Sequence, residues 1–512
     1  MAPIPASSQT PDTITPAPIP AHTTTTDIEL NPLPIQKPPS KKETTAADPF
    51  LVTFILPTDP HNPKDWPTGK KWAVTDVLSA TGFNRIMVST IMAPALPLIS
   101  SELHMNSTES AMALSIYLLA TAIGPLLIGP LSEVYGRKPI LHASNVWFLV
   151  WNLVCGFANT KQVLIAARFL AGFGASAIYA LASGVLGDVW RPEQRGKSLG
   201  VYLLIPLLGS AVGPIIGGFM AGRTTWRWMF WSTSIFQAIM IAVSFSVFDE
   251  THAPTILRKR ARQLRRERND GRYKTLEERL HDQHHRQCRA FTRPLRLLLT
   301  HPIIQINALI SAFDYGILYI VLSTFSSLWT ERYNVSVELS GLHYISIALG
   351  EILGSQVTAW LMDRHYARHA STSTSPTPNP ESRLPLTLLG ALLGPLGLFF
   401  YGWAAQYTPH WSIVDLGMLI ASFGMQSNGM PMQAYIIETY PQHISSAAAA
   451  AQLLRSLTAF CFPLFAPRMY AVLGFGWANS TLAFAGLVLG VPAPLGLWWV
   501  GARLRGRMGS SY

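Results

Sequence analysis

Long apolar runs separated by short polar segments repeat along most of the chain. Each run approaches the roughly 20 residues that an α-helix needs to cross about 30 Å of hydrocarbon. They are too long for buried strands, so they predict transmembrane helices. Six runs precede a basic segment and six follow it, at about residues 73–99, 110–130, 139–158, 162–186, 197–221, 226–248, 302–325, 340–362, 385–403, 411–433, 447–472 and 480–500.

The runs divide the chain into two apolar halves and three polar parts. Residues 1–72 begin with a Pro- and Thr-rich stretch that has no periodic apolar face, which predicts a disordered tail ahead of a short pre-span motif. Residues 73–248 and 302–500 each predict a six-helix bundle, joined by a basic loop at 249–301 and followed by a tail at 501–512. The predicted fold is therefore all-α and polytopic, with 12 transmembrane helices in two bundles.

Charge supports this class and sets the orientation. Charged residues make up only 13% of the chain, against about 25% in soluble domains, which excludes a soluble globule. Lys and Arg concentrate in loops on one side, including Arg137, Lys138 and the basic loop, so both termini are expected to be cytoplasmic. The sequons at Asn106, Asn334 and Asn479 then fall outside, where they predict N-glycosylation.

The net charge of +11 does not indicate nucleic acid, because much of it lies in the loop between the two apolar halves. At the inner membrane surface such a segment is attracted to anionic lipid. Within it, Ile256, Leu257, Ala261 and Leu264 have helical spacing, which predicts a short helix lying on the membrane interface.

Enzyme and cofactor sites are not indicated. The sequence has no nucleophile with its base, phosphate-binding loop or metal-ligand spacing. His281, His284 and His285 resemble a metal cluster, but they lack a further ligand nearby, so we expect a solvated loop and no metal.

Three segments combine glycine with charge or proline. A turn between the second and third runs carries an acid and two bases that can pair, and the fourth run carries an arginine on a glycine-lined helix. The fifth run has small residues at fourfold spacing around a proline, a pattern that permits close helix contact. The residues concerned are Gly129, Glu133, Gly136, Arg137 and Lys138 in the turn, Arg168 in the fourth run, and Gly209, Gly213, Pro214, Gly217 and Gly218 in the fifth.

In this order, the three segments resemble signatures of the major facilitator superfamily. The turn resembles the signature between spans two and three, with Glu133 where Asp is usual, and the fourth-run segment has Ala171 in place of a frequent Gln. The fifth-run segment is similar to the signature of drug antiporters, which implies export by proton exchange. Tyr315 to Tyr319, and Arg455 with the segment Phe462 to Phe465, resemble the fungal twelve-span multidrug and polyamine exporters.

Ionisable residues within the runs are candidates for proton coupling, because each costs at least about 2.5 kcal/mol at membrane depth. By its depth and by the resemblance, Arg168 is expected to lie in the translocation cavity. Asp314 and Glu351 are the candidate titrating carboxylates, with a structural hydrogen bond between helices as the alternative for both. Asp415 lies near the end of its run and is expected to reach water.

The leading hypothesis is proton-coupled efflux of a hydrophobic or amphipathic small molecule, a drug or a self-made fungal toxin or secondary metabolite. A polyamine or organic-acid carrier is the alternative; a non-transporting membrane sensor would favour a longer folded cytoplasmic domain. We expect membrane lipid, cargo and protons as partners, no nucleic acid, no cofactor besides the proton gradient, and no enzyme activity. The protein is expected to be a multi-pass monomer of the plasma membrane, with the vacuolar membrane left open.

Overall fold

The computed structural model describes residues 50–55, 58–279, 295–372, 380–440 and 444–508, which are helical apart from turns, loops and one isolated bridge. The described residues all belong to one unit, Pro49–Tyr512.

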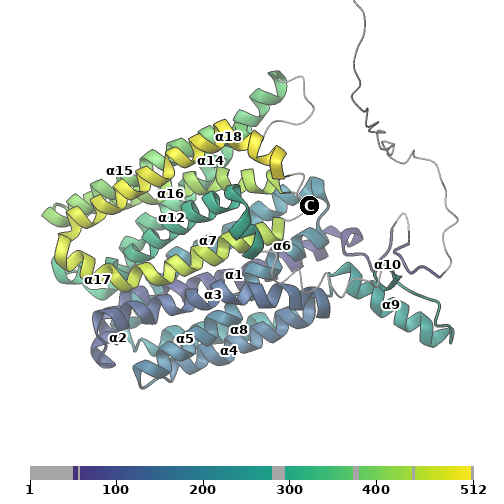
Figure 1. The fold of residues 1–512 in the computed structure, drawn as a ribbon. Helices are drawn as coiled ribbons and strands as arrows, with labels where there is room; N and C mark the ends of the chain where they lie inside the picture. The colour runs from purple at the N-terminus through teal and green to yellow at the C-terminus, as the bar shows by residue number, and fades with distance from the viewer. Residues whose placement is uncertain (1–49, 56–57, 280–294, 373–379, 441–443, 509–512) are drawn as a thin grey trace, which may run out of the picture. The chain divides into compact units, whose positions relative to one another are not determined.

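The first half of the chain forms one group of helices (Figure 1). The capping box of Asn106 and Glu109 begins α3, and a proline at the first position begins α7. The fourth predicted span is divided at Ser176 into α5 and α6. The elements are η1 (Pro63–Asp65), α1 (Thr68–Thr90), η2 (Ala93–Ala95), α2 (Leu96–Glu102), α3 (Ser107–Tyr135), α4 (Arg137–Gly156), α5 (Lys161–Ala175), α6 (Ala177–Val189), α7 (Pro192–Arg223), α8 (Arg227–Val247), α9 (Ala253–Glu267) and α10 (Leu276–Arg279).

The second half repeats the arrangement. The segment α17 consists of two helices that meet at Gly474, where φ is +71°, a conformation that favours glycine. The first covers the predicted span 447–472, and the second begins the span 480–500, which α18 completes. Gln406 Oε1 accepts a hydrogen bond from Phe475 N at 2.9 Å just beyond this kink. The elements are α12 (Pro302–Ser327), η3 (Leu328–Arg332), α13 (Val337–Ser340), η4 (Gly341–His343), α14 (Tyr344–Thr372), η5 (Pro380–Leu386), α15 (Thr387–Tyr407), α16 (Trp411–Thr439), α17 (Ile444–Gly490) and α18 (Pro492–Met508).

Each of the twelve predicted runs coincides with a helix, with successive helices, or with one part of α17. Among the described residues, 9 helical segments are long and apolar enough to cross a membrane, and one of them, Ala447–Arg505, covers two predicted spans. The helical, multi-pass class is therefore confirmed, while the count of twelve and the cytoplasmic termini stay predictions.

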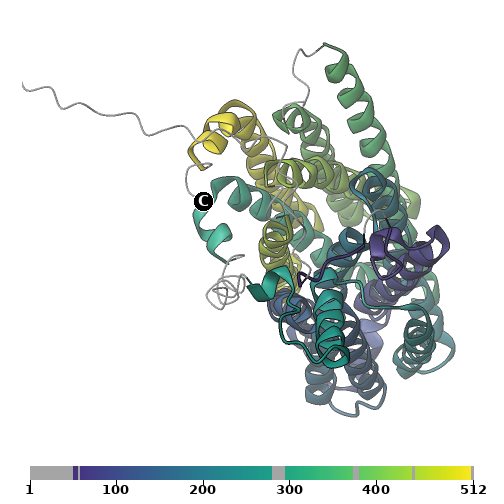
Figure 2. The same cartoon turned by 90° about the vertical axis from the view of Figure 1, so that its right-hand side faces the viewer.

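The helices pack mainly within their own half. In the first half α1 packs on α7 and α4 on both α5 and α8, whereas in the second α12 packs on α17 and α15 on α16. Figure 2 shows the two groups side by side. We call the end at which α9 and α10 lie the inner end, since the sequence predicts it to be cytoplasmic, and the opposite end the outer end.

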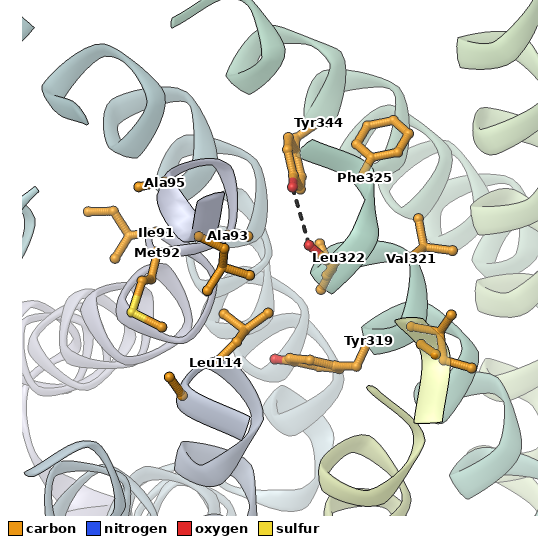
Figure 3. Close-up of a cluster of buried hydrophobic side chains, with 14 of the residues drawn as sticks. Ile91, Met92, Ala93, Ala95, Leu114, Tyr319, Val321, Leu322, Phe325 and Tyr344 are labelled. Carbon is orange, nitrogen blue, oxygen red and sulfur yellow. Dashed lines mark hydrogen bonds between the residues drawn. The ribbon is translucent and has the colours of Figure 1, made fainter. Parts of the chain in front are cut away.

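The outer ends of the halves are packed together. A buried apolar cluster contains Ile91 and Leu114 from the first half and Tyr319, Leu322 and Phe325 from the second. Figure 3 shows Tyr319 pointing toward Leu114, so side chains from the two halves meet directly. Nearby, Ser326 Oγ donates a hydrogen bond of 2.8 Å to the Pro94 carbonyl oxygen. The described conformation is therefore closed at its outer end.

The inner end of the first half carries a folded cap, in which the predicted pre-span motif contacts the basic loop. Val52 N donates to the Lys274 carbonyl oxygen at 3.0 Å, which joins the segment before α1 to the basic loop. Arg260 pairs with Asp59 at 2.8 Å. Arg191 donates a hydrogen bond to Asp65 and thereby holds the pKa of that carboxyl below its usual range.

The helix predicted from the spacing of Ile256 to Leu264 is present as α9. Its Ala261 is fully buried within the protein, so the interfacial packing predicted for this residue is instead internal. Lys259, Arg262 and Arg266 lie three or four residues apart on α9. Contact of this basic helix with anionic lipid stays a prediction.

Candidate functional site

Arg168 lies inside the first half rather than between the halves. Its side chain is completely buried. Nη1 donates to the Val88 carbonyl oxygen at 2.9 Å, and Nε and Nη2 donate to the carbonyl oxygens of Ala113 and Leu114, both at 3.3 Å. The guanidinium lies 4.8 Å from the centre of the Tyr117 ring. Arg168 thus ties α5 to α1 and α3, and the described residues include no carboxylate paired with it.

Asp314 faces the interior of the second half. Its Oδ2 accepts a hydrogen bond of 3.0 Å from Asn428 Nδ2, which links α12 to α16. The two residues line a cavity of about 20 Å³ together with Gly390, Gly394 and Met425. This volume suits a single water molecule. The contact matches the structural hydrogen bond that the sequence left as the alternative.

Glu351 makes a contact between the halves. Its Oε2 accepts a hydrogen bond of 3.1 Å from the hydroxyl of Ser210, so it joins α14 to α7. Ser210 lies between Gly209 and Gly213 of the antiporter-like segment. Both side chains are partly exposed. Of the three residues predicted to couple protons, only Glu351 lies at this interface, and the structure does not bring the three together.

Other polar side chains cross between the halves. Tyr319 Oη donates to Ser89 Oγ at 3.4 Å, and Thr121 Oγ1 donates to Ser456 Oγ at 3.2 Å. Sequence reasoning missed these partners, although small hydroxyl residues within an apolar run are a known signal of interhelical hydrogen bonding. Beside them the Arg455 guanidinium lies 4.0 Å from the centre of the Tyr315 ring. The interface is therefore aromatic, with few charges.

The antiporter-like segment packs on both halves. A Cβ added to Gly213 would lie 2.6 Å from Thr90 Oγ1, and one added to Gly217 would lie 2.0 Å from the carbonyl oxygen of Ile91, both at the outer end of α1 in the same half. On another face of α7, Gly218 approaches the Val337 carbonyl oxygen of the second half, where its Cβ would be 2.9 Å away. The glycines thus permit the backbone of α7 to contact α1 on one face and the second half on another. This explains why the segment has glycines instead of larger side chains.

The turn between α3 and α4 is held by residues that the sequence did not pair with it. Arg137 Nε lies 3.4 Å from Asp188 Oδ2 of α6, and Arg137 N donates to Glu250 Oε1 at 2.8 Å. Gly136 has φ +101°, and a Cβ there would meet Glu250. Glu133 is exposed, and the described residues include no ion pair for it. The expected pairing of Glu133 with the bases of this turn is therefore not seen, and Arg137 contacts Asp188 and Glu250 instead.

His252 completes the contacts at this turn. Burial, together with the nearby Arg137 and Arg258, lowers the pKa of His252 to about 4. The ring is therefore neutral at neutral pH, where its Nδ1 lies 2.9 Å from Thr255 Oγ1. Changes of pH around neutrality leave this contact unaltered.

Arg137→Gln is expected to slow transport about tenfold, the effect of losing one charge-assisted hydrogen bond of about 1.5 kcal/mol. The reason is that Asp188, partly buried on α6, would lose the arginine that contacts its carboxylate. Lys138→Gln is the matched control, because Lys138 makes only a 3.6 Å contact with the more exposed Asp249. Turnover and equilibrium cargo affinity should be measured separately. Lost affinity with unchanged turnover would place Arg137 in the cargo site instead.

The titratable residues near the ends of the spans have specific partners. His343 Nδ1 lies 2.8 Å from Asp415 Oδ2, and the His343 ring stacks on Trp329 at 3.6 Å between centroids. Asp415, which is expected to reach water, thus keeps a partly exposed side chain but also has a histidine partner. His281, His284 and His285 lie outside the described residues, within which no group of three or more potential metal ligands occurs.

The three sequons differ in accessibility. Asn106 caps α3 through its Oδ1, which leaves Nδ2 for a glycan, and neither Asn106 nor Asn334 is buried. Asn479 is completely buried, and its Nδ2 donates to the Phe475 carbonyl oxygen at 2.9 Å. The prediction of Asn479 as an acceptor therefore does not fit the folded chain.

Removal of N-glycans should increase the gel mobility of the wild-type protein, because Asn106 and Asn334 are accessible. We expect Asn106→Gln and Asn334→Gln each to remove one step of that shift, while Asn479→Gln leaves it unchanged. A smaller shift in Asn479→Gln than in the wild type would contradict the assignment of Asn479 as unmodified. No shift in the wild type would contradict the outside location of the loops with Asn106 and Asn334.

Comparison with known proteins agrees with the architecture. The sequence profile of the Major Facilitator Superfamily matches residues 78–463. The chain is 54% identical over 425 residues to a protein named probable efflux pump mfs2 of Aspergillus flavus, covering 82% of this chain and 100% of that protein. It is 43% identical over 480 residues to the efflux pump vrtL of Penicillium aethiopicum, covering 94% and 95%.

Solved structures show the same fold at low sequence identity. The crystal structure of a D-xylose-proton symporter aligns with a TM-score of 0.63 and 17% identity, covering 83% of this chain and 98% of that one. An inward-open structure of the E. coli xylose transporter XylE aligns with a TM-score of 0.60 and 16% identity, covering 84% and 95%. The two helical halves, the glycine-dependent contacts of α7 and these matches together show that the chain belongs to the major facilitator superfamily.

Proposed function

We propose that the protein exports a hydrophobic or amphipathic small molecule in exchange for protons, by alternating access between its two halves. The observation that carries this proposal is the Ser210–Glu351 hydrogen bond, which joins a carboxylate of the second half to the antiporter-like segment of the first. Efflux pumps among the relatives support the outward direction. Membership of a transporter family also distinguishes the protein from an enzyme.

Proton binding at Glu351 would change the free energy of closing the outer end. A charged carboxylate at membrane depth costs at least about 2.5 kcal/mol, so closure of α14 against α7 is more favourable with the proton bound. The proton would enter while Glu351 is open to the outside and leave toward the inner side. Cargo would then drive the return, and the two halves would rock about the interface. Arg168 keeps α1, α3 and α5 in place during this motion.

The interface favours an aromatic or otherwise hydrophobic cargo. Tyr315 and Tyr319 have their rings 5.1 Å apart, and such rings can contact a planar apolar molecule. A polyamine would need several carboxylates between the halves. Because Asp314 faces the interior of the second half, Glu351 is the acid that could serve, which disfavours the polyamine alternative. A drug or a self-made secondary metabolite fits better.

The plasma membrane is the proposed location, since export there removes the cargo from the cell, and the vacuolar membrane is the alternative. Cells lacking the protein should accumulate the cargo and become more sensitive to it, which a panel of planar hydrophobic compounds and polyamines can test. Lower internal cargo in the deletion would show an importer and overturn the proposal. Selective accumulation of polyamines would favour the alternative carrier.

A further inference from the structure

A large groove lies on the side of the first half that faces away from the second half. Its volume is about 590 Å³, and it is lined by His142, Val146, Trp147, Val150 and Trp151 of α4 and by Phe245 of α8. Val146, Val150 and Phe245 are 45%, 50% and 56% exposed, so the groove opens toward the surrounding bilayer. A volume of this size lies within the range of small-molecule sites in proteins.

The groove contains one polar side chain whose hydrogen bonds are not made. His142 is only 7% exposed, and neither of its ring nitrogens has a hydrogen-bond partner among the described residues. The ring stacks on Phe245 at 4.0 Å between centroids. A buried polar group without a partner is unfavourable and is normally satisfied by protein, water or ligand. Since Phe245 is largely exposed, a rotation of its ring would give a ligand access to the imidazole.

The position of His142 restricts what that ligand can be. His142 lies five residues after the first residue of α4, and hence close to the inner end of the helix. From there the apolar lining continues toward the outer end as far as Trp151. From His142 to Trp151 the helix rises about 14 Å, close to half of the roughly 30 Å hydrocarbon core. The groove therefore has a polar end near the inner headgroups and an apolar body as long as one leaflet.

We propose that this groove binds a membrane sterol from the inner leaflet, with the sterol hydroxyl hydrogen-bonded to His142. A sterol has a rigid, flat apolar body and one hydroxyl. The apolar body can lie against the indole rings of Trp147 and Trp151, whose centroids lie 6.0 Å apart, and the hydroxyl satisfies the imidazole. A phospholipid fits less well, because Lys138, one turn before His142, already contacts Asp249. Within the part of the chain that the structure describes, His142 also has no acidic partner to favour its charged form.

Photolabelling of the purified full-length protein in liposomes tests the proposal, with a diazirine-bearing sterol and, separately, a diazirine-bearing phospholipid. Sterol labelling should map to residues 142–151 and be competed by unlabelled sterol. His142→Phe, which keeps an aromatic ring for stacking, should weaken sterol labelling about fivefold, the factor for one hydrogen bond of about 1 kcal/mol. Val146→Trp, which fills the groove, should abolish it.

Val357→Trp on α14 is the matched control, because Val357 is 38% exposed on a helix of the other half, and its labelling should equal that of the wild type. All variants should elute as the wild type does in gel filtration. Equal sterol labelling of wild type, His142→Phe and Val146→Trp would overturn the proposal. So would labelling of residues 142–151 by the phospholipid that unlabelled sterol does not compete.

Discussion

Gly213→Leu is expected to abolish export while the protein still reaches the membrane. At this position even a Cβ would lie 2.6 Å from Thr90 Oγ1 and 2.8 Å from the Met87 carbonyl oxygen, so leucine must push α7 away from α1. Leucine is a better helix former than glycine by nearly 1 kcal/mol, and the loss therefore arises from packing alone. Overpacking typically costs about 1–3 kcal/mol. The displaced α7 would also lose its contact with the second half through Gly218.

Gly496→Leu is the matched control for this change. Gly496 lies in α18, where no atom of the described residues, apart from its chain neighbours and the nearby helix backbone, comes within 4 Å of the position of an added Cβ. Both variants should be compared by cargo efflux per amount of protein in the membrane. Wild-type efflux from Gly213→Leu, or an equal loss in Gly496→Leu, would show that the close contact between α7 and α1 has no part in transport.

Glu351→Gln should remove transport driven by a pH gradient while leaving exchange of cargo for cargo. Glutamine resembles the protonated acid in shape and charge, so the Ser210 hydrogen bond can persist although no proton is bound or released. Ser210→Ala should have a smaller effect, about fivefold, because it removes one hydrogen bond worth about 1 kcal/mol. Gradient-driven and exchange transport should be measured on the same reconstituted protein.

Asp314→Asn distinguishes the two acids. Since Asp314 bonds Asn428 inside the second half, we expect this variant to retain gradient-driven transport, with lower thermal stability as the main effect. Loss of gradient-driven transport in Asp314→Asn, with retention in Glu351→Gln, would assign the proton to Asp314 and refute the role given to Glu351.

Much of the fold follows from the sequence because bilayer thickness sets the length of each apolar run. The run predicted at 139–158 corresponds to α4, Arg137–Gly156, and the run at 411–433 lies within α16. The division at Ser176 and the abrupt kink at Gly474, without a polar loop between the two helices, could not be predicted in this way. Both depend on local backbone geometry and on neighbours distant in the sequence, such as Gln406 beside Gly474.

The candidate site was harder to predict. Helical periodicity indicates which residues share one face of a helix, but it does not indicate which other helix packs against that face. Asp314 and Tyr315 are consecutive, yet they contact different helices. Asp314 accepts a hydrogen bond from Asn428 of α16, whereas Tyr315 lies against Arg455 of α17. The pair Ser210 and Glu351 is separated by 141 residues. Nothing in the spacing of either run identifies that partner, so the two acids, Asp314 and Glu351, were equal candidates until their contacts were known.

Inside-out vesicles containing the reconstituted protein provide the most direct test of proton-coupled export. With the vesicle interior made acidic, as the outside of the cell would be, cargo should be taken up against its concentration gradient, and a protonophore should stop this uptake. Vesicles with Glu351→Gln should show no such uptake at any imposed pH gradient. Wild-type uptake that continues unchanged in the presence of the protonophore would contradict proton coupling.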